Sequence, residues 1–182
     1  MKKNILVLTG SPRKNGNTNA MVSAFKTTSN ANGHEVTVFN TTTNRIKGCV
    51  ACDTCWSKGT ACSFTDGFTE LEPLLEQADM LVMASPLYFF GFTSQLKAAI
   101  DKLYAYIKDS TKRPLKITDA LLLTCGGTDD ENEFSGLVNT YKHICSYLKW
   151  NNKGELIITK VNKIGDIDEK SLQKVESLAK RI

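Results

Sequence analysis

Residues 4–18 decide the fold, and they read NILVLTGSPRKNGNT. The segment passes from a short apolar run, residues 4–8, into a polar loop, residues 10–18. A continuous apolar run of this length is typical of a strand that is buried on both faces of a parallel sheet. A helical pattern of apolar residues follows from Ala20, and Asn17 or Thr18 can cap it. The segment therefore predicts a strand, a long polar loop and a helix.

The same alternation of strand and helix recurs along the chain. Strands of this kind, separated by helices, predict a parallel sheet that is covered on both faces. We expect a single α/β domain over residues 1–182, with one irregular cysteine-rich loop at about residues 45–67. Further strands are expected at residues 35–40, 80–84, 120–124 and 155–159, and further helices at residues 70–78, 93–107, 134–148 and 171–180.

Composition excludes several classes of protein. The chain has 182 residues, of which 41% are hydrophobic and 23% charged, so a disordered or collagen-like chain is excluded. The net charge of +4 is too small to argue for nucleic acid. The apolar run near the start is shorter than the roughly 7–15 residues of a signal peptide, and none approaches the roughly 20 residues of a membrane span. We expect a cytoplasmic protein that binds neither nucleic acid nor a membrane.

Three loops follow predicted strands directly, at residues 10–18, 85–91 and 125–128. In an open parallel sheet, ligands bind beyond the carboxyl ends of the strands, so we expect these loops to converge. Glycines, hydroxyls, an arginine and a following helix N-terminus make the first loop suitable for phosphate, although a plain helix-capping turn has the same composition. Five residues separate its two glycines, and the chain has no G-x-G-x-x-G, so neither a P-loop nor a dinucleotide fingerprint is present.

The second and third loops could contact a flat ring. The second carries four aromatic residues between positions 88 and 92, which suggests a wall for a ring, a subunit interface or local core packing. The third, Cys125-Gly126-Gly127-Thr128, could bring bare backbone close to a ring or form a simple glycine-rich turn. Convergence of all three loops on one site would be stronger evidence for a ligand-binding site than the composition of any single loop.

Two of these loops resemble the two motifs of flavodoxin-like NAD(P)H-dependent FMN reductases. The matching residues are 10–13 and 16–18 in the first loop and 85–91 in the second. The resemblance implies strand order 2-1-3-4-5 and a bound FMN. Lys97 and Asp101 follow the second motif, and we interpret them as a helix-surface pair rather than as catalytic groups. No catalytic side chain is expected, because the flavin supplies the reactive chemistry. The resemblance implies phosphate contacts from Ser11, Arg13, Asn17 and Thr18, further flavin contacts from Pro86, Leu87, Tyr88, Phe89, Phe90 and Gly91, and a position along the flavin for Gly126 and Gly127.

Four cysteines, Cys49, Cys52, Cys55 and Cys62, follow the spacing C-x2-C-x2-C-x6-C. Thiolates are the usual ligands of iron–sulfur clusters, whereas four-thiolate zinc sites typically use two separated pairs. The spacing is similar to the compact motif of iron–sulfur flavoproteins, a branch of the same group, and this implies a [4Fe–4S] cluster that exchanges electrons with FMN. The alternative is a loop without a cluster that shapes the flavin pocket or an oligomer.

The main functional hypothesis is an FMN-dependent oxidoreductase. It would take electrons from NAD(P)H as co-substrate and pass them through FMN to a quinone or another small acceptor. The alternative is an electron carrier whose cluster on the cysteine loop is reduced by ferredoxin, and a non-redox or zinc-binding module is a third reading. We expect a homodimer or homotetramer, because the aromatic loop and the cysteine segment are suitable interface material.

Overall fold

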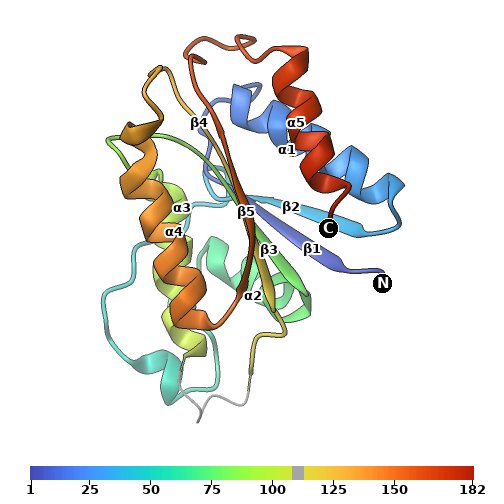
Figure 1. Ribbon diagram of the computed structural model, residues 1–182. Helices are drawn as coiled ribbons and strands as arrows, with labels where there is room; N and C mark the ends of the chain where they lie inside the picture. The colour runs from blue at the N-terminus through green and yellow to red at the C-terminus, as the bar shows by residue number, and fades with distance from the viewer. Residues whose placement is uncertain (108–112) are drawn as a thin grey trace.

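The computed structural model describes residues 1–107 and 113–182. Its strands form one five-stranded sheet in the order β2-β1-β3-β4-β5, and every neighbouring pair is parallel (Figure 1). The flavodoxin-like order implied by the resemblance is therefore confirmed. The strands are β1 (Asn4–Thr9), β2 (Glu35–Asn40), β3 (Met80–Pro86), β4 (Asp119–Cys125) and β5 (Asn151–Ile158).

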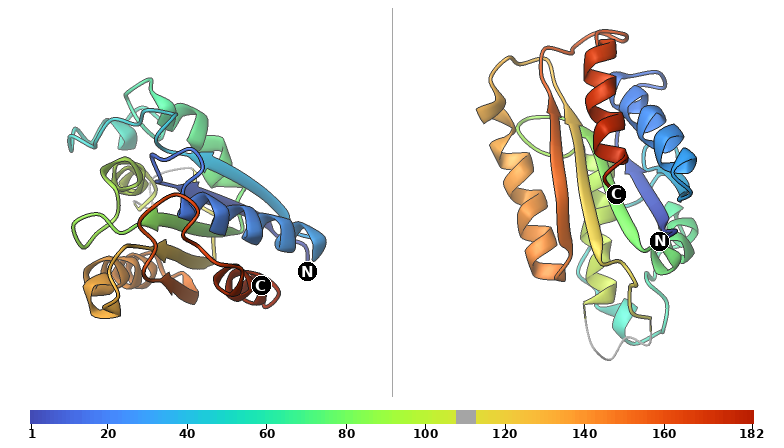
Figure 2. Two further views of the ribbon diagram at one scale, coloured as in Figure 1. Left: turned by 90° about the horizontal axis from the view of Figure 1, so that it is seen from above. Right: turned by 45° about the vertical axis from the view of Figure 1, so that its right-hand side comes forward.

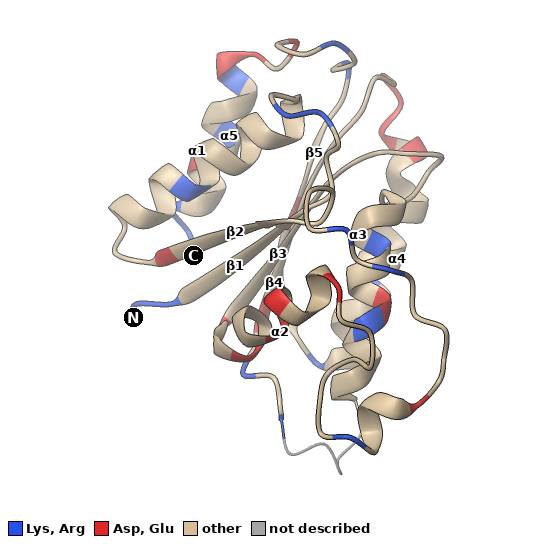
Figure 3. Ribbon diagram, turned by 180° about the vertical axis from the view of Figure 1, so that it is seen from behind, with Lys and Arg blue, Asp and Glu red and all other residues tan. Residues whose placement is uncertain are grey.

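Helices cover both faces of the sheet. Helices α1 and α5 pack on one face, and α2, α3 and α4 pack on the other (Figures 1 and 2). Seen from behind, basic and acidic residues are interspersed along the chain (Figure 3). Within the described ranges, no helix combines the length and apolar character needed to cross a bilayer. The helices are α1 (Asn17–Ala31), α2 (Gly67–Gln77), α3 (Ser94–Asp101), α4 (Ser135–Leu148) and α5 (Glu169–Ala179), with short 3-10 helices η1 (Thr54–Trp56), η2 (Lys102–Tyr106) and η3 (Glu131–Phe134).

Strand β1 shows how the sheet separates two cores. Ile5 and Val7 pack with α1 and α5, whereas Leu6 and Leu8 pack with α2, α3 and α4. All four side chains are at most 2% exposed. Since full burial of one such side chain contributes about 1.5–3 kcal/mol, the apolar run stabilises both layers at once. This is why the sequence of β1 is continuously apolar and does not alternate between apolar and polar residues.

The structure differs from the sequence prediction at several element boundaries. Gly16, rather than Asn17 or Thr18, occupies the N-cap of α1, so the predicted cap was wrong. The helix predicted over residues 93–107 divides into α3 and the 3-10 helix η2. Strand β5 begins at Asn151, four positions ahead of the prediction, because Asn151 and Asn152 pair with Asp119 and Ala120 of β4.

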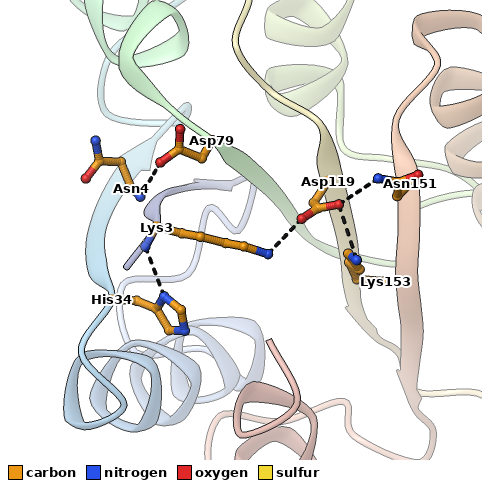
Figure 4. A network of polar contacts seen from close by, with 7 residues as sticks. All are labelled: Lys3, Asn4, His34, Asp79, Asp119, Asn151 and Lys153. Carbon is orange, nitrogen blue, oxygen red and sulfur yellow. Dashed lines mark hydrogen bonds and ion pairs between the residues drawn. The ribbon is translucent and has the colours of Figure 1, made fainter. Parts of the chain in front are cut away.

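A network of ion pairs and hydrogen bonds links residues at the amino ends of the strands (Figure 4). The Nζ of Lys3 lies 2.7 Å from Asp119 Oδ2, while Asp119 Oδ1 accepts a hydrogen bond from Asn151 Nδ2 at 3.0 Å. The Nζ of Lys153 lies 3.3 Å from the same Oδ1. Burial opposes ionisation of Asp119, yet hydrogen bonds from these neighbours lower its pKa. The network joins the starts of β1, β4 and β5.

Candidate functional site

The loops after β1, β3 and β4 meet in one pocket at the carboxyl ends of the strands, as predicted. Its volume is about 80 Å³. That is room for a phosphate-sized group, whereas pockets for whole ligands hold roughly 300–1,000 Å³. A larger group would therefore extend from the pocket onto the open surface or widen it. The lining residues are Ser11, Arg13, Gly16, Asn17, Thr18, Pro86, Leu87, Tyr88, Cys125, Gly126, Gly127, Val161 and Asn162.

The N-terminus of α1 opens into this pocket without a side-chain cap. The N-cap residue is Gly16, which has no side chain to accept from the first turn. By contrast, Asp66, Thr93 and Asp168 cap α2, α3 and α5 with their own side-chain oxygens. The first N–H groups of α1 and the positive end of its dipole are therefore available to an anion.

Gly10 allows the first loop to lie directly on α3. A Cβ at this position would lie 2.3 Å from the Oγ1 of Thr93 and 2.7 Å from the Cβ of Leu96. The Gly10 N–H also donates to the carbonyl of Ala84 at 2.9 Å, which links the loop to β3. The glycine is thus required for close approach, and it fixes the position of the loop.

Two polar side chains of the first loop, Arg13 and Asn17, bind the β5–α5 loop instead of pointing freely into the pocket. Arg13 Nη1 donates to the carbonyl of Asn162, and Asn17 Nδ2 donates to the carbonyl of Lys163 at 2.9 Å. An incoming anion must share or replace these acceptors. Val161 and Asn162 were not predicted from the sequence, although their position just after the carboxyl end of β5 was a usable signal.

Cys125 lies beneath the first loop, at the end of β4. Its Sγ is 3.3 Å from the Oγ1 of Thr18. Burial raises the pKa of the Cys125 thiol, although the hydrogen bond with Thr18 and the charge of Arg13 act in the opposite direction. We therefore assign Cys125 as a neutral thiol that supports the Thr18 hydroxyl at the pocket wall.

The aromatic loop forms a tight turn with two strained residues. The N–H of Tyr88 donates to the carbonyl of Gly91 at 3.1 Å, and the reverse bond is 3.0 Å long. Between them, Phe89 and Phe90 have φ values of 43° and 63°, the sign that a type I′ turn requires and that asparagine and glycine usually supply. Phe89 is 100% exposed and Phe90 is 58% exposed. Strain and exposure at the same two residues are typical of functional sites.

The predicted contacts of the aromatic loop therefore fall into two groups. Pro86, Leu87 and Tyr88 line the pocket. Phe89, Phe90 and Gly91 lie outside its walls, so their proposed contact with a flavin stays a prediction. Lys97 and Asp101 form the expected helix-surface ion pair, with 2.6 Å between Nζ and Oδ1.

The four cysteines of the irregular loop line a second, smaller pocket of about 30 Å³ beside η2. Cys49 and Cys52 are exposed, and Cys55 and Cys62 are half-buried. Burial raises the pKa of Cys55, and the neighbouring thiols add to the rise, which reflects their proximity. Hydrogen bonds from Thr54 and Ser63 lower the pKa of Cys52 to about 7.

This donor set fits an iron–sulfur cluster better than a single ion. A cluster binds each thiolate to a separate iron, so its ligands surround a volume, whereas a zinc ion needs all its sulfurs about 2.3 Å from one point. Among the described residues, no three His, Cys, Asp or Glu side chains converge on one ion. The hollow has a volume of about 30 Å³, so a cluster of eight iron and sulfide atoms would extend from it toward the surface or widen it.

A larger hollow, of about 310 Å³, lies between α2 and the strands β1 and β2. Its walls include Asn4, Glu35 and Gln77. These residues lie at the amino ends of β1 and β2 and at the end of α2, away from the three loops. Size alone therefore does not identify the site, and the pocket beside the free end of α1 has the better chemistry for a phosphate.

Comparison with known proteins gives one family and several relatives. A family model described as NADPH-dependent FMN reductase matches residues 3–155. An iron-sulfur flavoprotein of Archaeoglobus fulgidus is 37% identical over 97 residues, which are 53% of this chain and 44% of that protein. An iron-sulfur flavoprotein of Methanocaldococcus jannaschii is 28% identical over 123 residues, which are 68% of this chain and 58% of that protein. The chain thus matches only about half the length of these curated relatives.

Among solved structures, an NAD(P)H:quinone oxidoreductase from Methanothermobacter marburgensis aligns with a TM-score of 0.72 and 17% sequence identity. The alignment covers 100% of this chain and 95% of that one. An FMN-dependent NADH-azoreductase from Bacillus anthracis, solved in complex with FMN, aligns with a TM-score of 0.70 and 16% identity, over 98% of each chain. At these identities the likeness establishes a shared fold.

Proposed function

The chain belongs to the NADPH-dependent FMN reductase family, and from that premise we propose that it is an FMN-dependent oxidoreductase that uses NAD(P)H. The observation that carries the proposal is the pocket formed by the three loops, into which the uncapped N-terminus of α1 opens. Bound FMN would accept a hydride from the nicotinamide and release the electrons to an acceptor. The work of the protein is to bind and orient the cofactor.

The residues of the pocket have distinct roles in this proposal. The free N–H groups of α1 and the hydroxyls of Ser11 and Thr18 would hold the phosphate, with Arg13 balancing its charge. Gly126 and Gly127 also line the pocket and would present their backbone to the flat ring. The first group of residues would contact the anionic phosphate of the ligand, and the second would contact its flat ring.

The proposal is tested by titrating flavin-free protein with FMN and following the quenching of flavin fluorescence. Arg13→Ala should weaken binding about 10- to 100-fold, because a hydrogen bond to a charged group contributes roughly 1.5–3 kcal/mol. Arg181→Ala is the matched control, since Arg181 is exposed beyond the end of α5. Failure of the wild type to bind micromolar FMN, or equal affinity of the two variants, would contradict the proposal.

We propose a quinone or a similar small, flat molecule as the electron acceptor. The pocket is open to the surface and is bordered by Tyr88, which is 44% exposed and can contact a planar ring. The test is steady-state oxidation of NADH and NADPH by the FMN-loaded protein, with menadione or with ferricyanide as acceptor. Saturable reduction of menadione supports the proposal, and reduction of ferricyanide alone opposes it.

The cysteine pocket favours a second candidate function, an electron carrier with a [4Fe–4S] cluster that ferredoxin reduces. Four thiols line one hollow, and the matched curated relatives include proteins named iron-sulfur flavoproteins. Iron and acid-labile sulfide should be measured on protein purified without oxygen, with about four irons per chain expected. Cys62→Ser should lose the iron, whereas Cys145→Ser, on the buried face of α4, should retain it. An iron-free wild type would refute this candidate.

We also propose that the chain forms a homodimer or homotetramer. The exposed rings of Phe89 and Phe90 form an apolar projection, which is more stable when a partner covers it. Light scattering over a range of protein concentrations tests this directly. A monomer at all concentrations would exclude it, and loss of the oligomer in Phe89→Ser would support it.

A further inference from the structure

A buried ion pair lies against the cysteine pocket. The Nζ of Lys102, in η2, is 2.8 Å from the Oδ2 of Asp66, and the two side chains are only 2% and 4% exposed. Lysine and aspartate are almost never buried to this extent unless they are paired. Such a pair is weak evidence for stability, because the loss of hydration offsets much of the attraction between the charges. Its position therefore needs a separate explanation.

Asp66 is held in place from several directions. Its Oδ1 accepts the N–H of Phe68 at 2.8 Å and thereby caps α2, while its Oδ2 accepts the N–H of Lys47 at 2.9 Å. Burial disfavours its charge, yet these bonds and Lys102 hold the pKa of Asp66 below its usual value. Since Lys47 and Asp66 lie near the two ends of the cysteine loop, the carboxylate joins both ends of the loop to η2.

Lys102 is the member of the pair that lines the cysteine pocket, whereas Asp66 lies outside its walls. The ammonium also lies 5.5 Å from the ring centre of Phe64 and 5.3 Å from that of Phe68. These rings attract the cation and exclude water from it. Asp53 is the acidic residue of the pocket lining, and its Oδ1 accepts from the hydroxyl of Tyr104 at 3.2 Å. The pocket thus combines four thiols with one rigidly held cation.

We propose that Lys102 is the countercharge of the thiol pocket, fixed there by Asp66, and that it raises the reduction potential of an iron–sulfur cluster bound by the four cysteines. The inference rests on the proposed electron-carrier function. A cluster with four thiolate ligands is anionic and becomes more so when it gains an electron. The positive member of this buried ion pair lines the pocket and Asp66 lies outside it, so the pair favours the reduced form, because solvent screens buried charges only weakly.

The experiment compares Lys102→Met and Asp66→Asn in anaerobically reconstituted protein. The readout is the midpoint potential, from a redox titration followed by absorbance, together with iron content and Tm. Lys102→Met removes the cation and should shift the potential to more negative values. Asp66→Asn leaves the cation unpaired and should shift the potential to more positive values, while asparagine still caps α2. The double variant should fall between the two single variants.

Lys47→Met is the matched control. Lys47 is exposed, and its Nζ lies 5.8 Å from the centre of the same Phe64 ring. Solvent screens an exposed charge, so its removal should shift the potential less than the removal of Lys102. An equal shift for the two lysines would overturn the inference, because burial would then have no special effect.

The remaining outcomes separate the inference from the function on which it rests. If the wild type takes up no iron, the electron-carrier function fails, and the inference fails with it. Suppose that the wild type takes up its full content of iron. If both single variants then leave the midpoint potential of the cluster unchanged, or shift it in the same direction, only the inference fails. A purely structural role would lower Tm and iron content in both variants without shifts of opposite sign. If the single variants lose iron but the double variant regains it without a change in potential, the pair is structural.

Discussion

The two ends of the sheet are built on opposite principles. At the amino ends, Asp119 has a partner for each carboxylate oxygen, and the N–H of Asn4 donates to Asp79 Oδ2 at 2.8 Å. The carboxyl ends have the uncapped start of α1 and the two phenylalanines with positive φ. Polar groups are thus satisfied at one end and left available at the other.

This difference separates stability from binding. Groups that already have partners contribute to folding, whereas free N–H groups and strained turns reduce stability but can contribute to ligand binding. The ends of an open α/β sheet are suited to this division, since ligands bind beyond the carboxyl ends. Substitutions at the amino ends should therefore lower stability without altering FMN affinity, whereas substitutions that relieve a strained or unpaired group at the carboxyl ends should raise stability.

The largest effect is expected for Asp119→Ala. The substitution leaves Lys3 and Lys153 without their shared partner, and both lysines are partly exposed, so the free energy of unfolding should fall by about 2 kcal/mol. For a chain of this size, that corresponds to a fall of roughly 4–8 °C in Tm. FMN affinity should not change in the folded fraction. Asp129→Ala, an exposed carboxylate after β4, is the control and should alter stability by less than about 0.5 kcal/mol.

Acid should weaken the same network. Burial opposes the charge of Asp119, but its hydrogen-bonding neighbours lower its pKa below the unfolded value of about 3.9. Its stabilisation is therefore present above about pH 4 and is lost as the pH falls through the lower folded pKa. Urea midpoints measured between pH 3 and 7 should fall on acidification less steeply in Asp119→Asn than in the wild type. Identical slopes would contradict the assignment.

At the carboxyl ends, a substitution should instead increase stability. Replacing Phe89 by Asn and Phe90 by Gly supplies the residues that a type I′ turn prefers, and should raise the free energy of unfolding by about 1–2 kcal/mol. Phe89 is fully exposed, so little burial is lost. Urea denaturation measures the gain, and the KM for menadione shows whether the rings contact the acceptor. A loss of stability, measured at concentrations where both proteins are monomeric, would show that the turn is not strained.

The smallest effect is expected for Thr124→Val. The Thr124 hydroxyl is buried at the end of β4 and has no hydrogen-bond partner among the residues that the structure describes. An isosteric methyl group removes this polar atom and should stabilise the fold by about 1 kcal/mol. Thermal unfolding of the variant tests this, with Thr140→Val as the control, because the Thr140 hydroxyl donates to the Gly136 carbonyl at 2.8 Å. A destabilised Thr124→Val would imply an unrecognised partner.

The order of elements could be predicted from the sequence because each strand is a short apolar run followed by a polar loop. The beginning of β5 could not be predicted in this way. Residues 151–154 read as a turn, but Asn151 pairs with Asp119 and a register shift between Ala120 and Leu122 accommodates the next residues. Pairing with a neighbouring strand overrode local preference, as is common at the edge of a sheet.

The pocket at the carboxyl ends could be predicted in outline, because parallel strands bring their loops to one edge. The bonds of Arg13 and Asn17 to the β5–α5 loop could not, since they join residues about 150 positions apart in sequence. The spacing of the cysteines predicted a common site, and all four line one pocket. The ion pair between Lys102 and Asp66 left no signal, because neither residue has distinctive neighbours in the sequence.

The bonds that close the first loop onto the β5–α5 loop also have a consequence for kinetics. In the proposed FMN complex, Arg13 and Asn17 would share or exchange the carbonyls of Asn162 and Lys163 as they bind the phosphate. We expect the observed rate of FMN association to rise with FMN concentration and then to level off at the rate of this exchange. Stopped-flow fluorescence would then measure how fast the two loops part.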